Sequence, residues 1–240
     1  MANIGVLLCL FVAVEGVRYH SVCNNVQDSS YLLSVQQLSG QNITLKELID
    51  GNVTLILNYF SHFTGFTYQY LQLNALINEV TMKTHRYNLS VIGFPCNQFA
   101  HQEPADNETE LYNGLKFVRP GDGYVPRFAL MNKIDVNGVN ETALYAYLKK
   151  SCPLPEGAIF YPKESFWDPI KPRDISWNFE KFILDRQGKP LLRFLPKVEP
   201  DFLTQILKTV GNLNANVDKE EILRSVKVYL DTIENRYSHS

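Results

Sequence analysis

The sequence lacks a strong excess of charge of either sign. Its 240 residues contain 23 lysines and arginines and 25 aspartates and glutamates, a formal net charge of -2. Acidic and basic residues are interspersed, so the chain has no basic stripe of the kind that binds nucleic acid or an anionic membrane. We therefore expect neither of these partners.

Apolar runs long enough to cross a membrane are also missing. A transmembrane helix needs about 20 apolar residues, whereas the run Ile4–Val14 has only eleven and is followed by the small residue Gly16. This pattern is typical of a signal-peptide core, so residues 1–16 are predicted to be a signal peptide and the protein to be secreted and extracellular. An uncleaved anchor or a buried strand is the alternative.

Five Asn-x-Ser/Thr sequons support export, because such sequons are glycosylation acceptors in secreted proteins. None has proline in the middle, although any single triplet can arise by chance. We expect a glycoprotein with some of the five sites occupied. The acceptors are Asn42, Asn52, Asn88, Asn107 and Asn140.

Cysteine is scarce, with only four residues in the chain. Loss of the leader removes Cys9 and leaves an odd number in an oxidising compartment, so one internal disulfide is the maximum. Because Cys96 sits at the end of an apolar strand, Cys23 with Cys152 is the preferred pair. Three free thiols, or an intermolecular bridge through Cys23, are the alternatives.

The rest of the chain, 45% hydrophobic by overall composition, is long enough for one substantial core and short for two. We expect one α/β domain over residues 17–211 and a helical extension over residues 212–240. A buried strand at Thr54–Tyr59, a helix from Thr67 and a second strand at Leu89–Phe94 indicate parallel strands with a right-handed crossover. The apolar stripe of that helix comprises Tyr70, Leu73, Leu76, Ile77 and Val80.

Two hairpins are predicted elsewhere. One is short and turns at Ser39–Gln41 after the alternating segment Tyr31–Leu38, and the other turns at Asp185–Lys189 between Phe179–Leu184 and Leu191–Phe194. These antiparallel strands would complete a mixed sheet.

Four further helices are predicted from periodicity and from breaks at glycine and proline. Two of them, Glu108–Phe117 and Thr142–Lys150, are separated by a surface loop at Val118–Pro126. The last helix could dock on the domain, pair with another copy or lie alone. Apolar stripes define the two terminal helices: Phe202, Ile206, Leu207 and Val210, then Ile222, Val226, Leu230 and Ile233.

Three segments carry a resemblance to a known family. They are Gly65–Leu76, with Thr67, Tyr70 and the run LNAL, Gly93–Glu103 (GFPCNQFAHQE) and Trp177–Phe182 (WNFEKF). The chain resembles the glutathione peroxidases, including their secreted forms, from about Tyr31 to Phe194. The resemblance implies a thioredoxin-like fold, a central mixed sheet flanked by helices, and thiol-dependent reduction of hydroperoxides in the response to oxidative stress.

The resemblance also implies a catalytic tetrad of selenocysteine or cysteine, glutamine, tryptophan and asparagine. Three members match Gln102, Trp177 and Asn178. Their family role is to donate hydrogen bonds to the chalcogen and favour its ionised form, for which amide and indole N–H groups are suited. Ordinary packing of Trp177 and Asn178 is the alternative.

The first tetrad member has no match. Alignment backwards from Gly65 places Thr64 at the nucleophile position, and alignment forwards from Asn58 places Phe63 there. A helix terminus stabilises an anion by about 1 kcal/mol, far too little to ionise a threonine hydroxyl, and oxygen forms no counterpart of a sulfenic acid. Thr64 could simply cap the helix.

The sequence therefore predicts a family member with lost or greatly reduced peroxidase activity. One alternative is a peroxidase that uses Cys96, whose apolar neighbours indicate a buried, unreactive thiol. A non-catalytic extracellular binding or scaffold protein is another.

Partners also follow from the resemblance. The expected substrates are a hydroperoxide and glutathione or another thiol, with glutathione as co-substrate. Arg119 and Arg193 match basic positions near the thiol site of the family. Both could instead be solvated surface residues. The segments Val118–Gly121 and Asp135–Gly138 resemble those through which tetrameric members assemble, so a homotetramer is predicted. The five histidines show no ligand-like spacing, and we expect no metal and no cofactor.

Overall fold

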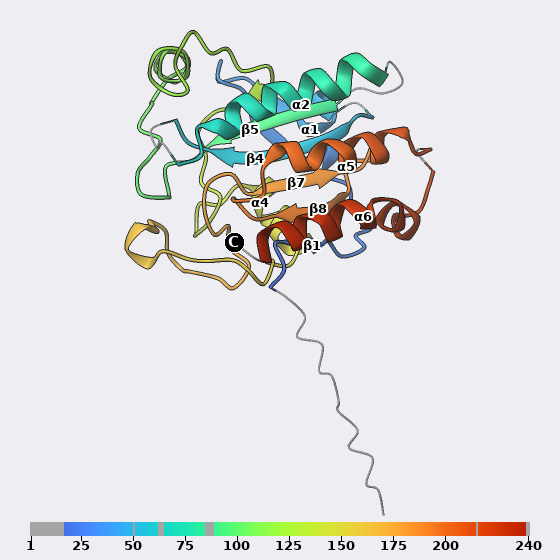
Figure 1. Cartoon of the computed structure of the whole chain (residues 1–240). Helices are drawn as coiled ribbons and strands as arrows, with labels where there is room; N and C mark the ends of the chain where they lie inside the picture. The colour runs from blue at the N-terminus through green and yellow to red at the C-terminus, as the bar shows by residue number, and fades with distance from the viewer. Residues whose placement is uncertain (1–16, 50, 62–64, 85–88, 215, 239–240) are drawn as a thin grey trace, which may run out of the picture.

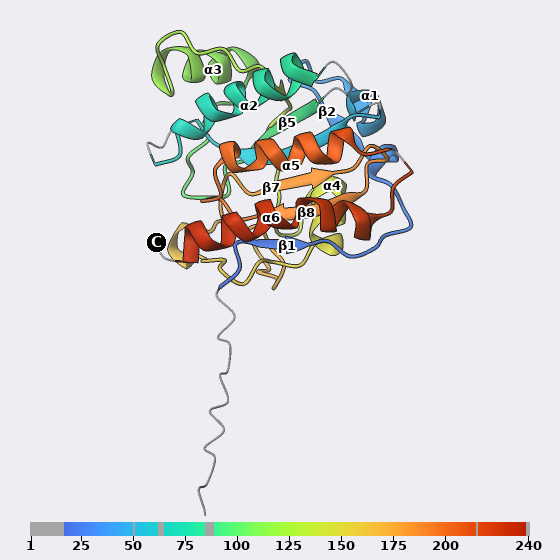
Figure 2. The ribbon, with the colours of Figure 1, turned by 45° about the vertical axis from the view of Figure 1, so that its right-hand side comes forward.

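A computed structural model describes residues 17–49, 51–61, 65–84, 89–214 and 216–238. Its centre is a mixed six-stranded sheet with the order β1-β8-β7-β4-β5-β6 (Figures 1 and 2). Both the mixed character of the sheet and its flanking helices agree with the predicted α/β class. The strands are β1 (His20–Val22), β4 (Val53–Tyr59), β5 (Leu89–Pro95), β6 (Ala129–Leu130), β7 (Lys181–Leu184) and β8 (Pro190–Phe194).

The parallel part of the sheet is the predicted strand, helix, strand unit. β4 and β5 pair in parallel, with Leu55 opposite Val91, and α2 (Tyr68–Thr84) connects them. Tyr70, Leu73 and the rest of the predicted stripe pack into the core because residues three and four apart share one helix face. Gly93 is required in β5, since a Cβ there would lie 2.8 Å from the Phe128 ring.

The antiparallel part is the predicted hairpin of β7 and β8, with β4 paired on one side and β1 on the other. Gly188 has φ +72 in the turn, and its N–H donates to the carbonyl of Asp185 at 3.0 Å. A side chain there would also meet the ring of Tyr31 at 2.6 Å. Glycine is therefore selected by both backbone conformation and space.

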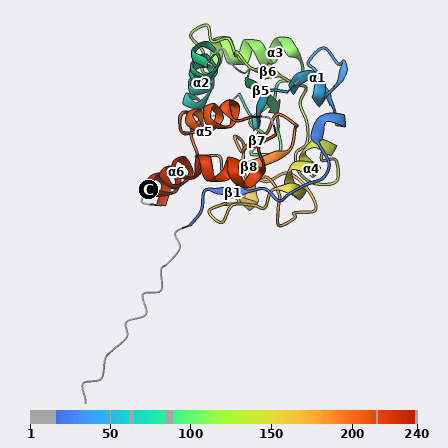
Figure 3. The same cartoon turned by 90° about the vertical axis from the view of Figure 1, so that its right-hand side faces the viewer.

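Two hydrophobic clusters cover the two faces of the sheet (Figure 3). α2, α5 (Pro200–Asn212) and α6 (Lys219–Ser238) lie on one face, and α1 (Leu45–Ile49) and α4 (Ala143–Ser151) on the other. Leu55 and Leu57 of β4 belong to the first cluster and Ile56 to the second. This two-sided burial explains why β4 reads as a continuous apolar run.

The last helix docks on the domain. Val226 and Ile233 of α6 are fully buried in the first cluster, and the ring of Tyr237 lies 5.5 Å from that of Tyr19. The carboxylate of Glu234 accepts backbone N–H groups of Tyr19 at 2.9 Å and His20 at 3.2 Å. α6 therefore holds the first strand of the sheet in place.

Some predicted bounds differ from the structure. The first hairpin is β2 (Ser34–Gln36) with β3 (Asn42–Thr44), preceded by a 3-10 helix at Ser30–Leu32. The helix predicted to reach Phe117 is α-helical only over α3 (Glu108–Asn113) and continues as a π-helix, Gly114–Val118. The change begins at Gly114, a residue of low helix propensity. A further 3-10 helix covers Pro162–Glu164.

Cys23 and Cys152 form a disulfide between residues 129 positions apart, the pair preferred from the sequence. The bond links the end of β1 to the end of α4. The predicted signal peptide, residues 1–16, lies outside the described residues. No described helix is both long and apolar enough to span a bilayer.

Candidate functional site

The predicted tetrad positions lie in loops at the ends of neighbouring strands. One loop follows β4, a second follows β5, and a third leads into β7. Carboxyl ends of adjacent parallel strands share one edge of a sheet and commonly form binding sites. Thr64 and Phe63, the candidates for the nucleophile position, lie outside the described residues.

Asn178 is fixed to the strand that precedes the nucleophile position. Nδ2 of Asn58, in β4, donates to Oδ1 of Asn178 at 3.2 Å and to the carbonyl of Trp177 at 3.3 Å. The carbonyl of Asn58 accepts from the backbone N–H of Phe179 at 2.7 Å. Nδ2 of Asn178 is buried and has no hydrogen-bond partner among the described residues. A buried donor without a partner is unusual in a folded protein.

Phe179, directly after Asn178, adopts φ +66. Its ring stacks on Phe66 at 5.9 Å and meets Phe60 edge-on at 5.4 Å. A bulky residue in the left-handed region is strained and persists where its surroundings hold it. The aromatic contacts and the bond to Asn58 supply that support.

Trp177 lies between aromatic residues of two other segments. Its ring is 5.5 Å from Phe99, in the loop after β5, and 5.2 Å from Tyr161. Only 8% of Trp177 is exposed. Its indole also lines an open cavity of about 370 Å³, together with Phe66 and Leu195.

Gln102 occupies the turn after β5, where Ala100 and His101 both have φ 50. Its N–H donates to the carbonyl of Phe99 at 3.2 Å, so the turn rests against the segment that packs on Trp177. Oε1 of Gln102 is buried and lacks a partner within the described part of the chain. Gln102 and Trp177 are thus brought into one region, and Asn178 is adjacent to Trp177 in sequence.

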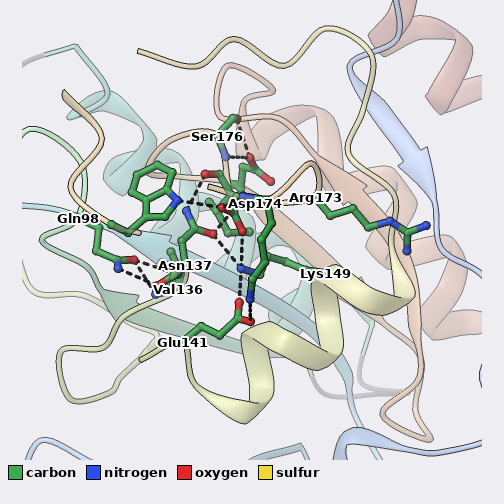
Figure 4. A network of polar contacts seen from close by, with 12 residues as sticks. Gln98, Val136, Asn137, Glu141, Lys149, Arg173, Asp174 and Ser176 are labelled. Carbon is green, nitrogen blue, oxygen red and sulfur yellow. Dashed lines mark hydrogen bonds and ion pairs between the residues drawn. The ribbon is translucent and has the colours of Figure 1, made fainter. Parts of the chain in front are cut away.

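A buried polar network holds these loops together (Figure 4). Lys149 of α4 pairs with Glu141, and its Nζ lies 3.0 Å from both Asp174 Oδ1 and Asn137 Oδ1. The other carboxylate oxygen of Asp174 accepts from Trp167 Nε1 at 2.9 Å. Lys149 and Asp174 are almost fully buried, so their charges compensate each other.

Asn137 and Gln98 extend this network to the backbone. Asn137 exchanges two hydrogen bonds of 2.9 Å with the backbone of Ile175 (Figure 4). Gln98 Nε2 donates to the Asn137 carbonyl at 2.9 Å, and its Oε1 accepts from the backbone of Val136 and Asn137. The amides therefore tie the loop after β5 to the segment that carries Trp177.

Arg193 is not a surface residue, and its predicted contact with glutathione is not supported. Its side chain is fully buried, and Nε donates to Oε2 of Glu180 at 2.7 Å. Its guanidinium also donates to the carbonyls of Arg173 and Asp174, each at 3.0 Å. Glu180 in turn accepts from the hydroxyl of Ser176 at 2.6 Å. Arg193 thus supports the Trp177 loop from inside the protein.

A second buried carboxyl lies beside the turn after β4. Oε1 of Glu103 accepts from the Ser61 hydroxyl at 3.0 Å, and the backbone N–H of Glu103 donates to Asn97 Oδ1 at 3.0 Å. Burial raises the pKa of Glu103 to about 7 despite the hydrogen bond from Ser61. This group titrates near neutral pH.

Cys96 is fully buried at the end of β5. Burial raises the pKa of its thiol to about 12, although nearby backbone groups lower it in part. Thiolates are the reactive form of cysteine, so Cys96 has the character of an inert core residue. The predicted high pKa agrees with this environment.

The remaining candidates occupy varied positions. Arg119 is half-buried in the loop after the π-helix. Asn137, which belongs to the predicted assembly segment, is buried and makes hydrogen bonds within the chain. Asn42, Asn107 and Asn140 are exposed, Asn52 donates to Ser90 Oγ at 3.1 Å, and Asn88 lies outside the described residues. Within the described ranges, no group of three or more His, Cys, Asp or Glu could hold a metal.

Sequence reasoning did not identify the polar network. Lys149 was predicted only as part of the helix Thr142–Lys150, and Glu180 and Lys181 only as part of the motif WNFEKF. Two adjacent charged residues at the start of an apolar strand were the available signal. Both are fully buried.

Comparison with known proteins agrees with this geometry. The family model for glutathione peroxidase matches residues 30–149. The chain is 41% identical over 170 residues to the epididymal secretory glutathione peroxidase of Rattus norvegicus, covering 71% of this chain and 74% of the relative. It is 37% identical over 220 residues to glutathione peroxidase 3 of Caenorhabditis elegans, covering 88% and 95%.

Solved structures give the same result for the fold. The crystal structure of Trgpx in apo form matches with a TM-score of 0.54 and 26% identity, covering 77% of this chain and 96% of that one. The structure of T. cruzi GPX1 matches with the same TM-score and identity, covering 79% and 100%. The predicted thioredoxin-like fold is confirmed.

Proposed function

The chain belongs to the glutathione peroxidase family, and from this premise we propose that it is a secreted homologue whose own reduction of hydroperoxides is lost or greatly reduced. The observation that carries the proposal is the absence of cysteine at positions 63 and 64, where the sequence has Phe63 and Thr64. Family members reduce hydroperoxides with thiols, and this chain retains the fold on which they do so.

The chemistry explains why the substitution matters. A chalcogenate attacks the peroxide oxygen, the O–O bond breaks, an alcohol leaves, and the oxidised sulfur or selenium is then reduced by thiol. Threonine supplies neither an accessible anion nor an oxidation product that thiols reduce. The buried and unpartnered Nδ2 of Asn178 would then be a donor retained without its acceptor.

The other cysteines of the described chain do not supply a replacement. Cys23 and Cys152 are joined to each other, and the Cys96 thiol is buried with its pKa raised to about 12. A peroxidase that uses Cys96 would need the core around β5 to open. These contacts therefore support a loss of peroxidase activity better than a peroxidase that uses Cys96.

Secretion, glycosylation and assembly belong to the same proposal. The leader at residues 1–16, the exposed acceptors Asn42, Asn107 and Asn140, and a relative called secretory all support export. A homotetramer is supported by Phe117 and Val118, which are 66% and 56% exposed beside the predicted assembly loop. We retain residues 17–211 as the family domain and residues 212–240 as a C-terminal helical extension.

Hydroperoxide consumption by the protein starting at Val17, with glutathione or thioredoxin as reductant, tests the proposal. Wild type and Cys96→Ser should both lack turnover. Thr64→Cys should gain activity if the remaining donors are correctly placed. Rapid turnover by the wild type would overturn the proposal, and its loss in a folded Cys96→Ser would identify Cys96 as the nucleophile.

A second candidate function is an extracellular binding protein without catalysis. The open cavity beside Trp177 favours it, since a preformed apolar cavity can bind a ligand whether or not chemistry follows.

A further inference from the structure

A second cavity lies at the end of the sheet opposite the predicted tetrad positions. Trp177 and Asn178 stand before the first residue of β7, whereas Asp185, which lines this cavity, follows its last residue. The four residues of β7 span about 13 Å. The cavity has a volume of about 470 Å³, within the usual range for small-molecule sites, and shares no lining residue with the cavity beside Trp177.

Three segments of the chain form the walls of this second cavity. They are residues 24–27 after β1, residues between 185 and 191 in the turn and first part of β8, and residues 216–219 at the start of α6. β1, β8 and α6 lie side by side (Figure 2), so these segments meet at one end of the three elements. No single stretch of the sequence could therefore reveal the cavity.

The walls are held in place by contacts within the protein. Nζ of Lys219 donates to the carbonyl of Cys23 at 2.6 Å and to that of Asn24 at 3.0 Å, which ties α6 to the segment after β1. Cys23 is also fixed by its disulfide to Cys152, and its backbone N–H donates to the carbonyl of Leu191 at 3.0 Å. The cavity is thus preformed, and a ligand would bind with little ordering of the protein.

Asp185 presents one carboxylate oxygen to the cavity. Its Oδ1 accepts from the backbone N–H groups of Gln187 at 2.8 Å and Lys189 at 2.9 Å, which fixes the carboxylate in the turn. No hydrogen bond from the described ranges reaches Oδ2, and this oxygen remains accessible. Burial raises the pKa of Asp185, although the two backbone N–H groups lower it in part. Hydrogen-bond donors of a ligand would replace the hydration that Oδ2 has lost.

The charges of the lining balance. Two carboxylates and two ammonium groups line the cavity, those of Asp185, Asp218, Lys189 and Lys219. Lys219 is already bound to the carbonyls described above, and Oδ1 of Asp218 accepts the backbone N–H of Glu221 at 2.8 Å. An ion of either sign would meet like charge as well as opposite charge. The lining therefore favours a neutral ligand.

Most of the other polar side chains in the lining are amides. An amide offers N–H donors and a carbonyl acceptor, and a hydroxyl group can bond to either. These amides belong to Asn24, Asn25, Gln27 and Asn216, all of them exposed. Val26, Leu191 and Val217 add apolar surface. Hydroxyl groups carried on a ring with apolar C–H faces would match this combination.

We propose that this cavity binds a neutral saccharide, either a free sugar or the terminal unit of a glycan. Its hydroxyl groups would donate to Oδ2 of Asp185 and exchange hydrogen bonds with the amide side chains, while its C–H groups contact Val26 and Val217. The inference goes beyond the proposed function, because the cavity lies at the other end of the sheet from the tetrad positions and binding needs no peroxide chemistry.

Backbone amide chemical shifts of the isotope-labelled protein starting at Val17 test the proposal, without peroxide or thiol. The probes are glucose, galactose, mannose and N-acetylglucosamine, each as the free sugar and as its methyl glycoside. At least one should give saturable shifts at residues 24–27, 185–191 and 216–219. Binding of a methyl glycoside would identify the terminal unit of a glycan as a ligand, and binding of free sugars alone would identify a free sugar.

Matched variants separate binding from folding. Asp185→Asn keeps the oxygen that holds the turn but replaces Oδ2 with an N–H donor, so it should weaken binding about tenfold. Gln27→Ala, an exposed change in the lining, should weaken it about threefold. Asp122→Asn removes an exposed carboxylate elsewhere and should leave the affinity unchanged. Thermal unfolding of each variant should match the wild type.

Four results would overturn the proposal. The first is no saturable shift with any of the sugars, and the second is a set of shifts confined to residues outside the three segments. Equal affinity in wild type and a folded Asp185→Asn is the third. The fourth is binding of glucosamine or glucuronate more than about tenfold tighter than glucose, because the site would then select an ion.

Discussion

The hydroxyl of Ser61 donates a 3.0 Å hydrogen bond to the carboxyl of Glu103, joining the end of β4 to the residue after Gln102. Glu103 is fully buried, and burial raises its pKa from 4.5 to about 7. Above pH 4.5 the unfolded chain has lost this proton while the folded chain keeps it. This contribution to folding stability is therefore complete below pH 4.5 and is lost as pH rises through 7.

Glu103→Gln should remove that pH dependence, because the amide stays neutral. We expect the variant to exceed the wild type in free energy of unfolding at pH 8, by at most about 3 kcal/mol, and to differ less at pH 5. Denaturant unfolding at both pH values measures this. Glu156→Gln, at an exposed position, is the control, and an unchanged pH slope in Glu103→Gln would contradict the assignment.

The buried pair of Glu180 and Arg193 predicts a strong and coupled effect on stability. Arg193→Met should lower the free energy of unfolding by about 3–5 kcal/mol, since it leaves Glu180 buried without a counter-charge. The double variant with Glu180→Met should lose less than the sum of the single changes. Denaturant unfolding of the four proteins gives the coupling energy.

The exposed pair of Lys227 and Asp231, with a distance of 2.8 Å, is a matched control for the buried pair. Lys227→Ala should change stability by about 0.5 kcal/mol or less, because water screens the pair. Equal effects of Lys227→Ala and Arg193→Met would show that Arg193 is not buried as described.

The docking of α6 predicts that a change near the C-terminus destabilises the whole domain. Ile233 is fully buried against the first core cluster, so Ile233→Ala should lower the free energy of unfolding by about 2–5 kcal/mol. Val228→Ala on the same helix should have an effect within about 0.5 kcal/mol, since Val228 is 62% exposed. If Ile233→Ala instead showed a separate unfolding transition at lower temperature, with the main unfolding transition unchanged, α6 would be a helix that unfolds independently of the domain.

Much of the fold follows from local sequence patterns, whereas the support of the site does not. The period of α2 and the apolar run of β4 are local signals, and the start of α2 and both ends of β4 were predicted within one residue. β1 has only three residues and exists because it pairs with β8, some 170 positions later in the chain. No local pattern reports such a partner.

The burial of charged residues was the larger gap. Arg193 was predicted to bind substrate because it matches a basic position near the thiol site of the family. Only the fold shows that it lies beside Glu180, the residue that precedes β7. Lys149 and Asp174 likewise meet through tertiary structure across 25 positions. By contrast, Gln102, Trp177 and Asn178 were identifiable because they lie in long family motifs.

The state of the cysteines predicts a simple thiol count for the chain beginning at Val17. Cys23 and Cys152 are paired and Cys96 is free, so Ellman's reagent should detect one thiol after denaturation without reductant and three after reduction. In the native protein at pH 8 the reaction should be very slow, because a thiol with a pKa of about 12 is almost entirely protonated and Cys96 is buried. Cys96→Ser should abolish the signal in denaturant. Rapid labelling of native Cys96 would show that the β5 core opens, and it would restore this thiol as a candidate for peroxide chemistry.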